Sequence, residues 1–153
     1  MRNEKPYLSF QTNNFIIKRE VFSKIKFNPE FENYGYEDLL FAMDLKSEHI
    51  KIHHIDNPIF NNDLETNEIY LKKAEESVES LAKMLKTESL KTKISEIKLV
   101  KAYNFLQKTY LSLIFQPLFS FMEEKIKKNL ISNNPNLRNL DLYKLGLLLR
   151  KMK

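Results

Sequence analysis

The stretch LKKAEESVESLAKML, residues 71–85, is the most regular part of the sequence. Its apolar residues recur at steps of three and four, which is the spacing of one face of an α-helix. They are Leu71, Ala74, Val78, Leu81 and Leu85. Asn62, followed three residues later by Glu65, resembles a capping box. The sequence therefore predicts a long amphipathic helix from about residue 65 to residue 86, with this apolar stripe buried.

More helix is predicted after this stretch. A second apolar stripe is formed by Leu99, Tyr103, Leu106, Tyr110 and Leu113. Pro117 is expected to end this second helix, because proline lacks an N–H group and clashes with the preceding turn. Shorter helices are expected around residues 118–130 and 140–150.

The N-terminal part of the chain is predicted to contain shorter elements. Residues 15–17 and 50–52 have the β-branched or alternating character of short strands. Residues 19–24 are expected to form a helical turn, and a helix is expected to begin at Glu37. The composition changes near residue 64 from Asn, Phe and Tyr to Leu and Lys. We therefore expect two parts, residues 1–64 and 65–153.

The composition is that of a folded chain in a reducing compartment. Of the 153 residues, 42% are hydrophobic and 12% aromatic, which is more apolar material than a disordered chain contains. The absence of cysteine excludes disulfides, thiolate metal sites and a cysteine nucleophile. The N-terminus lacks the apolar core of a secretory signal, and no stretch reaches about 18 uninterrupted apolar residues, so we expect a cytoplasmic protein.

The charge and the histidines predict no further type of site. The formal net charge of +5 is distributed among lysines that lie close to acidic residues, as on solvated helix faces. No nucleic-acid-binding motif is present, and no nucleic acid partner is expected. The three histidines are His49, His53 and His54. On a strand the last two would point to opposite faces, and no carboxylate spacing completes a metal site.

One acidic pair is a candidate for chemistry. Glu37 and Asp38 follow Tyr34-Gly35-Tyr36 at the start of a predicted helix. Acids are favoured at that position because the N–H groups of the first turn are unpaired. A carboxylate delivered by an aromatic loop is also suited to act as a general base toward a hydroxyl. The residues alone leave both interpretations open.

Several segments carry a resemblance to a known family. They are Asn14-Phe15-Ile16-Ile17-Lys18-Arg19-Glu20-Val21-Phe22, Phe27, Tyr34-Gly35-Tyr36-Glu37-Asp38, Ile55-Asp56-Asn57-Pro58-Ile59, Leu64-Glu65 and Leu71-Lys72-Lys73. In order and spacing they resemble the second half of the bacterial family 2 glycosyltransferases, over about residues 8–85. The resemblance implies an α/β fold (α+β, mostly helical): a partial GT-A catalytic domain with a few short strands in residues 1–64, followed by a helical C-terminal extension in residues 65–153.

The resemblance also implies roles for individual residues. Asp38 would be the catalytic base that deprotonates the acceptor hydroxyl, and Glu37 would orient either Asp38 or the acceptor. Asn14, Gly35 and Tyr36 would form part of the acceptor side of the site. The implied substrates are a nucleotide-sugar donor and a glycan or lipid-linked acceptor.

The donor side departs from the family pattern in two ways. Family members commonly carry a histidine after the Asp-Asn-Pro stretch that helps to hold a divalent metal, Mn or Mg, on the donor diphosphate. Asn61 occupies that position here, and an amide is a weaker ligand than imidazole for a transition metal. The family's nucleotide-binding strands and Asp-x-Asp motif precede the segment at Asn14 by well over a hundred residues, whereas thirteen residues precede it here. We therefore expect this chain to be the acceptor-side portion of such an enzyme and to be inactive in isolation. Either the gene is truncated, or a separate polypeptide provides the donor-binding half.

A second interpretation is a non-catalytic helical interaction module, or a membrane-peripheral module, derived from a glycosyltransferase. The run YLSLIFQPLFSFM, residues 110–122, is apolar nearly all round and is followed by Lys125, Lys127 and Lys128. It is too short to span a bilayer, but it suits an interface with anionic headgroups at the inner membrane. Burial of the run in the core of the helical part is the alternative.

Overall fold

The computed structural model describes residues 2–31, 34–60, 62 and 64–153. The chain divides into two compact units, Met1–Leu64 and Glu65–Lys153. The structure is 64% helix and contains no strand in the residues described. Among those residues, no helix combines the length and the apolar character that crossing a membrane requires.

The predicted α/β fold, a partial GT-A domain with short strands, is therefore wrong. Residues 15–17 and 50–52 have irregular backbone instead of strand. A strand satisfies its N–H and C=O groups only beside another strand, and the described part of the N-terminal unit contains none to pair with. The second segment is held by side chains, since Tyr7 Oη donates to the carbonyl oxygen of Ile50 at 3.1 Å.

The helices of the N-terminal unit are short. They are η1 (Arg2–Glu4), α1 (Arg19–Lys24), η2 (Pro29–Phe31) and α2 (Glu37–Ser47). The predicted helical turn at residues 19–24 and the predicted helix start at Glu37 are confirmed. Phe41 of α2 is fully buried and stacks on Phe27 with a ring-centroid distance of 4.3 Å. Phe10 and Phe22 also contact the Phe41 ring, so aromatic side chains provide much of this unit's core.

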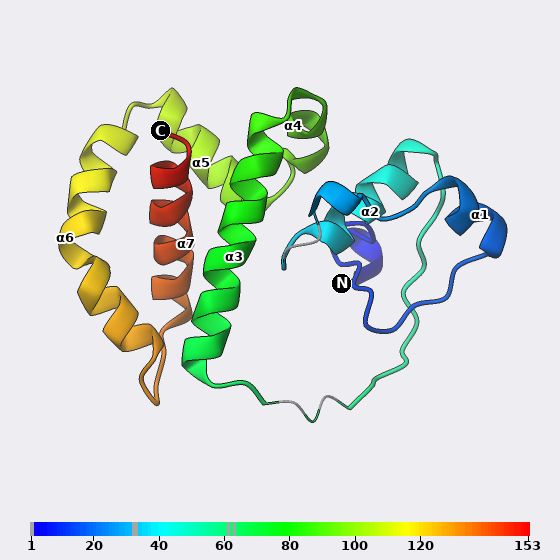
Figure 1. Ribbon diagram of the computed structural model, residues 1–153, viewed down its shortest axis with the longest axis horizontal. Helices are drawn as coiled ribbons and strands as arrows, with labels where there is room; N and C mark the ends of the chain where they lie inside the picture. The colour runs from blue at the N-terminus through cyan, green and yellow to red at the C-terminus, as the bar shows by residue number, and fades with distance from the viewer. Residues whose placement is uncertain (1, 32–33, 61, 63) are drawn as a thin grey trace. The chain divides into compact units, whose positions relative to one another are not determined.

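The C-terminal unit is a helical bundle. Its helices are α3 (Asn67–Lys86), α4 (Glu88–Ile94), α5 (Lys98–Lys108), α6 (Ser112–Leu130) and α7 (Leu137–Lys151). The last of these, α7, packs against α3, α5 and α6. Figure 1 shows α7 between α3 and α6. The C-terminal helix is therefore the central element of this unit.

Helix α3 confirms the prediction made from residues 71–85. All five residues of the apolar stripe are buried, as the three- and four-residue spacing required. The predicted capping box at Asn62 is wrong, because the helix begins two residues after Glu65. Thr66 is the N-cap, and its side chain accepts a hydrogen bond from the N–H of Ile69 at 3.4 Å.

The second predicted helix ends earlier than expected. The break lies at residues 109–111, where Tyr110 has a left-handed backbone with φ of 59°, and Pro117 lies inside α6. Pro117 leaves the carbonyl of Leu113 without its helical N–H partner, but Leu113 is exposed and water reaches this turn. The stripe predicted for this helix is accordingly only half-buried, and Tyr110 and Leu113 lie on the surface.

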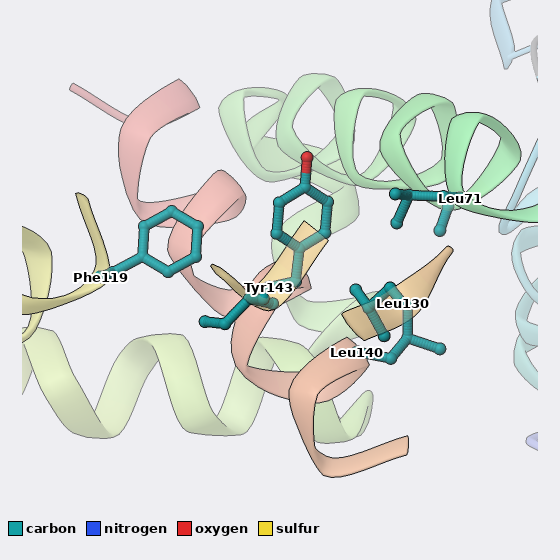
Figure 2. Packing of buried hydrophobic residues seen from close by; sticks show 7 residues of the cluster. Leu71, Phe119, Leu130, Leu140 and Tyr143 are labelled. Carbon is teal, nitrogen blue, oxygen red and sulfur yellow. The ribbon is translucent and has the colours of Figure 1, made fainter. Parts of the chain in front are cut away.

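The core between α3, α6 and α7 is centred on Tyr143, whose side chain is fully buried (Figure 2). Phe119, Leu71, Leu130 and Leu140 pack in the same cluster. The Tyr143 hydroxyl points toward α3 and donates to Glu75 Oε1 at 2.5 Å. Burial, followed by this hydrogen bond, raises the pKa of Tyr143. The phenol therefore stays protonated and links α7 to α3 through a polar contact inside an apolar cluster.

Candidate functional site

The acidic pair lies at the start of α2, after a strained turn. Gly35 has φ of 107° and Tyr36, the residue before the helix, has φ of 71°. A left-handed backbone costs a residue with a side chain roughly 1 kcal/mol or more. Such strain is concentrated at functional sites, where the surrounding structure holds it in place. The turn ends with the N–H of Leu40 donating to the Tyr36 carbonyl at 2.8 Å, which begins the helix.

Glu37 holds the turn that precedes it. Its Oε2 atom accepts a hydrogen bond from the backbone N–H of Gly35 at 2.7 Å. A charged acceptor makes a stronger hydrogen bond than a neutral one, so this contact stabilises the left-handed turn. The resemblance implied that Glu37 orients Asp38 or the acceptor. In the structure, the Glu37 carboxylate contacts the backbone of the preceding loop at Gly35.

Asp38 is held by a residue that the sequence did not identify. Thr12 Oγ1 donates to Asp38 Oδ1 at 2.7 Å, and the Thr12 N–H donates to Oδ2 at 3.1 Å. A carboxylate accepts about four hydrogen bonds, so these two leave about half of its capacity for another donor. Asp38 is half-buried, and its carboxylate is fixed in orientation. The 26-residue separation of Thr12 from Asp38 leaves no local sequence signal for this contact.

Asn14 joins the same region to the Asp-Asn-Pro stretch. Its Nδ2 atom donates to the carbonyl oxygen of Asn57 at 3.0 Å. Asn14 lies two residues after Thr12, so a single turn of chain contacts both Asp38 and Asn57. Three of the segments that carried the family resemblance, those around Asn14, Asp38 and Asn57, are therefore connected by hydrogen bonds within one unit.

Tyr36 contributes a neutral hydroxyl. Burial raises the pKa of the Tyr36 phenol to about 12. The phenol is therefore protonated near neutral pH and available as a hydrogen-bond donor. Gly35 and Tyr36 directly precede the acidic pair along the chain, and their contact with a substrate stays a prediction.

The described residues do not form a metal site. No group of three or more histidine, aspartate or glutamate side chains gathers in the part of the chain that the structure describes. The carboxylates of Glu37 and Asp38 already accept hydrogen bonds from Gly35 and Thr12. A ring nitrogen of His54 lies 2.8 Å from the carbonyl oxygen of Pro6, so this histidine has a structural contact. Asn61, at the position of the family's metal-binding histidine, lies outside the described residues.

A small apolar hollow in the C-terminal unit is a poor alternative site. It has a volume of about 180 Å³ and is lined by residues of α3 and α7 and of the chain around Leu130 and Pro135. Ligand pockets usually exceed about 300 Å³ and carry convergent polar groups. Of the lining residues Asn67 and Tyr70 carry polar groups, and the Asn67 amide already donates to the carbonyl oxygen of Ser132 at 2.7 Å. The acidic turn of the N-terminal unit is therefore the better candidate.

Comparisons with protein-family models, with curated proteins and with solved structures found no match to this chain.

Proposed function

We propose that the N-terminal unit supplies the acceptor side of a glycosyl-transfer site, with Asp38 as the general base. The observation that carries this proposal is that the Thr12–Asp38 and Asn14–Asn57 hydrogen bonds connect three of the family-like segments. A carboxylate held in one orientation, with capacity for another hydrogen bond, is suited to accept the proton of a sugar hydroxyl. The same residues also support a purely structural role, and the experiment below separates the two.

In the proposed reaction Asp38 removes the proton of the acceptor hydroxyl as the hydroxyl oxygen attacks the anomeric carbon of the donor sugar. The bond from the anomeric carbon to the nucleoside diphosphate breaks, and the diphosphate leaves with the electron pair. Thr12 keeps the Asp38 carboxylate aligned through its two hydrogen bonds. Attack from the side opposite the leaving group inverts the anomeric configuration.

The donor-binding groups would come from polypeptide outside these residues. Support for a further packing partner comes from the large apolar side chains that the N-terminal unit leaves on its surface. Ile16, Phe60 and Leu64 are almost fully exposed, and Ile55 is largely exposed. Apolar side chains exposed in this way are available for packing against a further segment. A nucleotide-sugar-binding segment packed on them would complete the site.

The test uses the chain joined to, or co-expressed with, the nucleotide-sugar-binding half of a family 2 glycosyltransferase. We expect Asp38→Asn to lower turnover by about 10² or more, the usual scale for loss of a general base, and to leave donor KM unchanged. Thr12→Val should lower turnover less, because Asp38 remains and loses only the hydrogen bond from Thr12 Oγ1, while it keeps the one from the backbone N–H of residue 12. Glu30→Gln, which removes an exposed carboxylate of the same unit, is the matched control and should behave as the wild type.

Two results would reject the catalytic assignment. One is Asp38→Asn turning over donor at the wild-type rate while circular dichroism shows an unchanged fold. The other is a loss of turnover that Glu30→Gln reproduces, since that would reflect the charge of the unit. Either result would favour the alternative, a non-catalytic interaction module, for which the exposed apolar residues of both units are the supporting observation.

A further inference from the structure

One face of α6, here called the outer face, carries exposed apolar residues in its N-terminal half and exposed lysines in its C-terminal half. An α-helix turns by about 100° per residue, so residues spaced by four, seven and eleven share one face. Ile114, Leu118 and Phe121 lie on such a face and are exposed by 69%, 55% and 88%. Lys125 follows Phe121 by one helical turn on the same face and is also exposed. The face is therefore apolar in its first half and basic in its second.

Neighbouring residues widen both parts of this face. Leu113 and Pro117 extend the apolar part on one side and are exposed. Lys128 extends the basic part by a further turn and is exposed as well, whereas Glu124, at the edge of the face, offsets part of the charge. Lys127 is turned away and lies 3.7 Å from Glu75 of α3, so it does not belong to this surface.

The opposite face of α6 is the one that holds the helix in the bundle. Phe119, Ile126 and Leu130 are buried in the cluster with Tyr143 of α7. Arg150 of α7 donates to Glu123 Oε2 at 2.6 Å. Since the helix is anchored from this side, its outer face stays outward without any rearrangement of the core, and the exposed apolar residues are not needed for packing within the unit.

We propose that this outer face of α6 binds the surface of an anionic lipid bilayer. The apolar half is about 10 Å long at 1.5 Å per residue. A helix with one apolar face lies in the plane of the interface, with that face inserted below the headgroups. Lys125 and Lys128 lie next to it, where they meet negatively charged headgroups. A second copy of the chain would bring the same two lysines and one glutamate, so charge complementarity favours the lipid. This inference goes beyond sugar transfer and does not depend on Asp38.

The test is co-sedimentation of the whole chain with vesicles of phosphatidylglycerol and phosphatidylcholine, compared with phosphatidylcholine alone. We expect binding to the anionic vesicles at low salt and much weaker binding to the neutral ones. Phe121→Ser and the double variant Lys125→Glu/Lys128→Glu should each weaken binding at least about tenfold, because each removes one of the two contributions.

Matched controls are available in the N-terminal unit. Phe60 is 99% exposed, so Phe60→Ser removes an equally exposed ring from another surface and should leave binding unchanged. Lys24→Glu/Lys26→Glu makes the same change of net charge as the α6 double variant and should have little effect. Because the chain has no tryptophan, Phe121→Trp provides a local probe, whose emission should shift to the blue with anionic vesicles, whereas that of Phe60→Trp should not.

Three outcomes would overturn the proposal. The first is that the wild-type chain does not bind anionic vesicles at low salt. Equal weakening by the α6 variants and their controls is the second, since it would indicate binding by net charge alone. The third is a concentration-dependent dimer in sedimentation equilibrium that Phe121→Ser dissociates, without vesicle binding, because the face would then join two copies. Unchanged circular dichroism of the surface variants excludes misfolding as the cause of lost binding.

Discussion

Three residues with side chains and positive φ lie where the chain changes direction. They are Tyr36 before α2, His49 after α2 and Tyr110 between α5 and α6, with φ of 71°, 57° and 59°. Each carries a steric cost of roughly 1 kcal/mol or more. Residues of this kind persist where the surrounding hydrogen bonds and packing fix them. The cause differs at each position, and His49 gives the clearest case.

His49 terminates α2 in a position that usually holds glycine. The N–H of Ile50 donates to the Leu45 carbonyl at 2.9 Å and the N–H of His49 donates to the Lys46 carbonyl at 3.1 Å. This pair of bonds defines a Schellman motif with His49 as its left-handed residue. The histidine that invited a metal interpretation in the sequence is therefore a helix-terminating residue.

We expect His49→Gly to stabilise the N-terminal unit by about 0.5–1 kcal/mol, because glycine has no Cβ to strain the left-handed backbone. Urea unfolding followed by circular dichroism measures the change. His49→Ala is the control, since alanine keeps the Cβ and should give no such gain. Equal stability of the glycine and alanine variants would show that the backbone strain at this position is negligible.

At the same scale, the sequence identified one half of the candidate site. Glu37 and Asp38 were recognisable because acids at a helix start follow a local rule. Thr12 was not, since its contact with Asp38 depends on how two distant segments fold together. The Glu37–Gly35 contact was also missed, because it depends on the left-handed turn and not on residue type alone.

At the scale of helices, close packing between α6 and α7 explains a glycine at residue 146, where helix propensity alone would favour alanine. Gly146 lies inside α7, where glycine is less favourable than alanine by about 1 kcal/mol. A Cβ atom built on Gly146 would lie 2.5 Å from carbon atoms of the Phe119 ring. That ring is buried and contacts Phe115, Tyr143 and Arg150, so moving it would disturb these contacts. The absence of a side chain at residue 146 lets α6 and α7 approach.

We expect Gly146→Ala to destabilise the C-terminal unit by about 1–3 kcal/mol, the usual range for overpacking, even though alanine favours the helix. Chemical unfolding of the variant measures the loss. Adding Phe119→Leu to Gly146→Ala should recover part of it relative to the sum of the single changes, because the smaller side chain leaves room for the methyl group. A stabilised Gly146→Ala variant would mean that propensity outweighs the contact with Phe119.

Elements stabilised by their own periodicity were predictable, and elements that depend on a partner were not. Helix α3 followed from an apolar stripe that any packed helix must bury. The strands expected at residues 15–17 and 50–52 failed because the two segments do not pair with each other. The side-chain pattern of a short segment does not determine which segment lies beside it. The break between α5 and α6 was predicted at Pro117, but it lies at Tyr110, which has a left-handed backbone. Tyrosine has no turn preference, so no sequence signal indicated a break at this residue.

At the scale of the molecule, the two units differ in how they are stabilised. The C-terminal unit has five helices, and α7 packs against three of the others. Its core includes the fully buried Val78, Leu81, Met84 and Tyr143. The N-terminal unit has short helices joined by irregular chain, and it leaves Ile16, Phe60 and Leu64 on the surface. Apolar surface removed from water is the main favourable term in folding, so the C-terminal unit should be the more stable.

We therefore expect residues 65–153, expressed alone, to fold cooperatively. Residues 1–64 alone should show weak helical circular dichroism and no sharp unfolding transition, because a chain of this size with an incompletely covered core is marginal. Thermal and urea unfolding of the two fragments and of the whole chain provide the comparison.

Leu81→Ala replaces a fully buried side chain of α3 and should destabilise the C-terminal fragment by about 2–5 kcal/mol. That loss would confirm that the unfolding transition of the fragment measures the stability of this core. Cooperative unfolding of residues 1–64 alone would show that the N-terminal unit needs no partner to cover its apolar surface, and would remove the main support for a donor-binding segment packed on it.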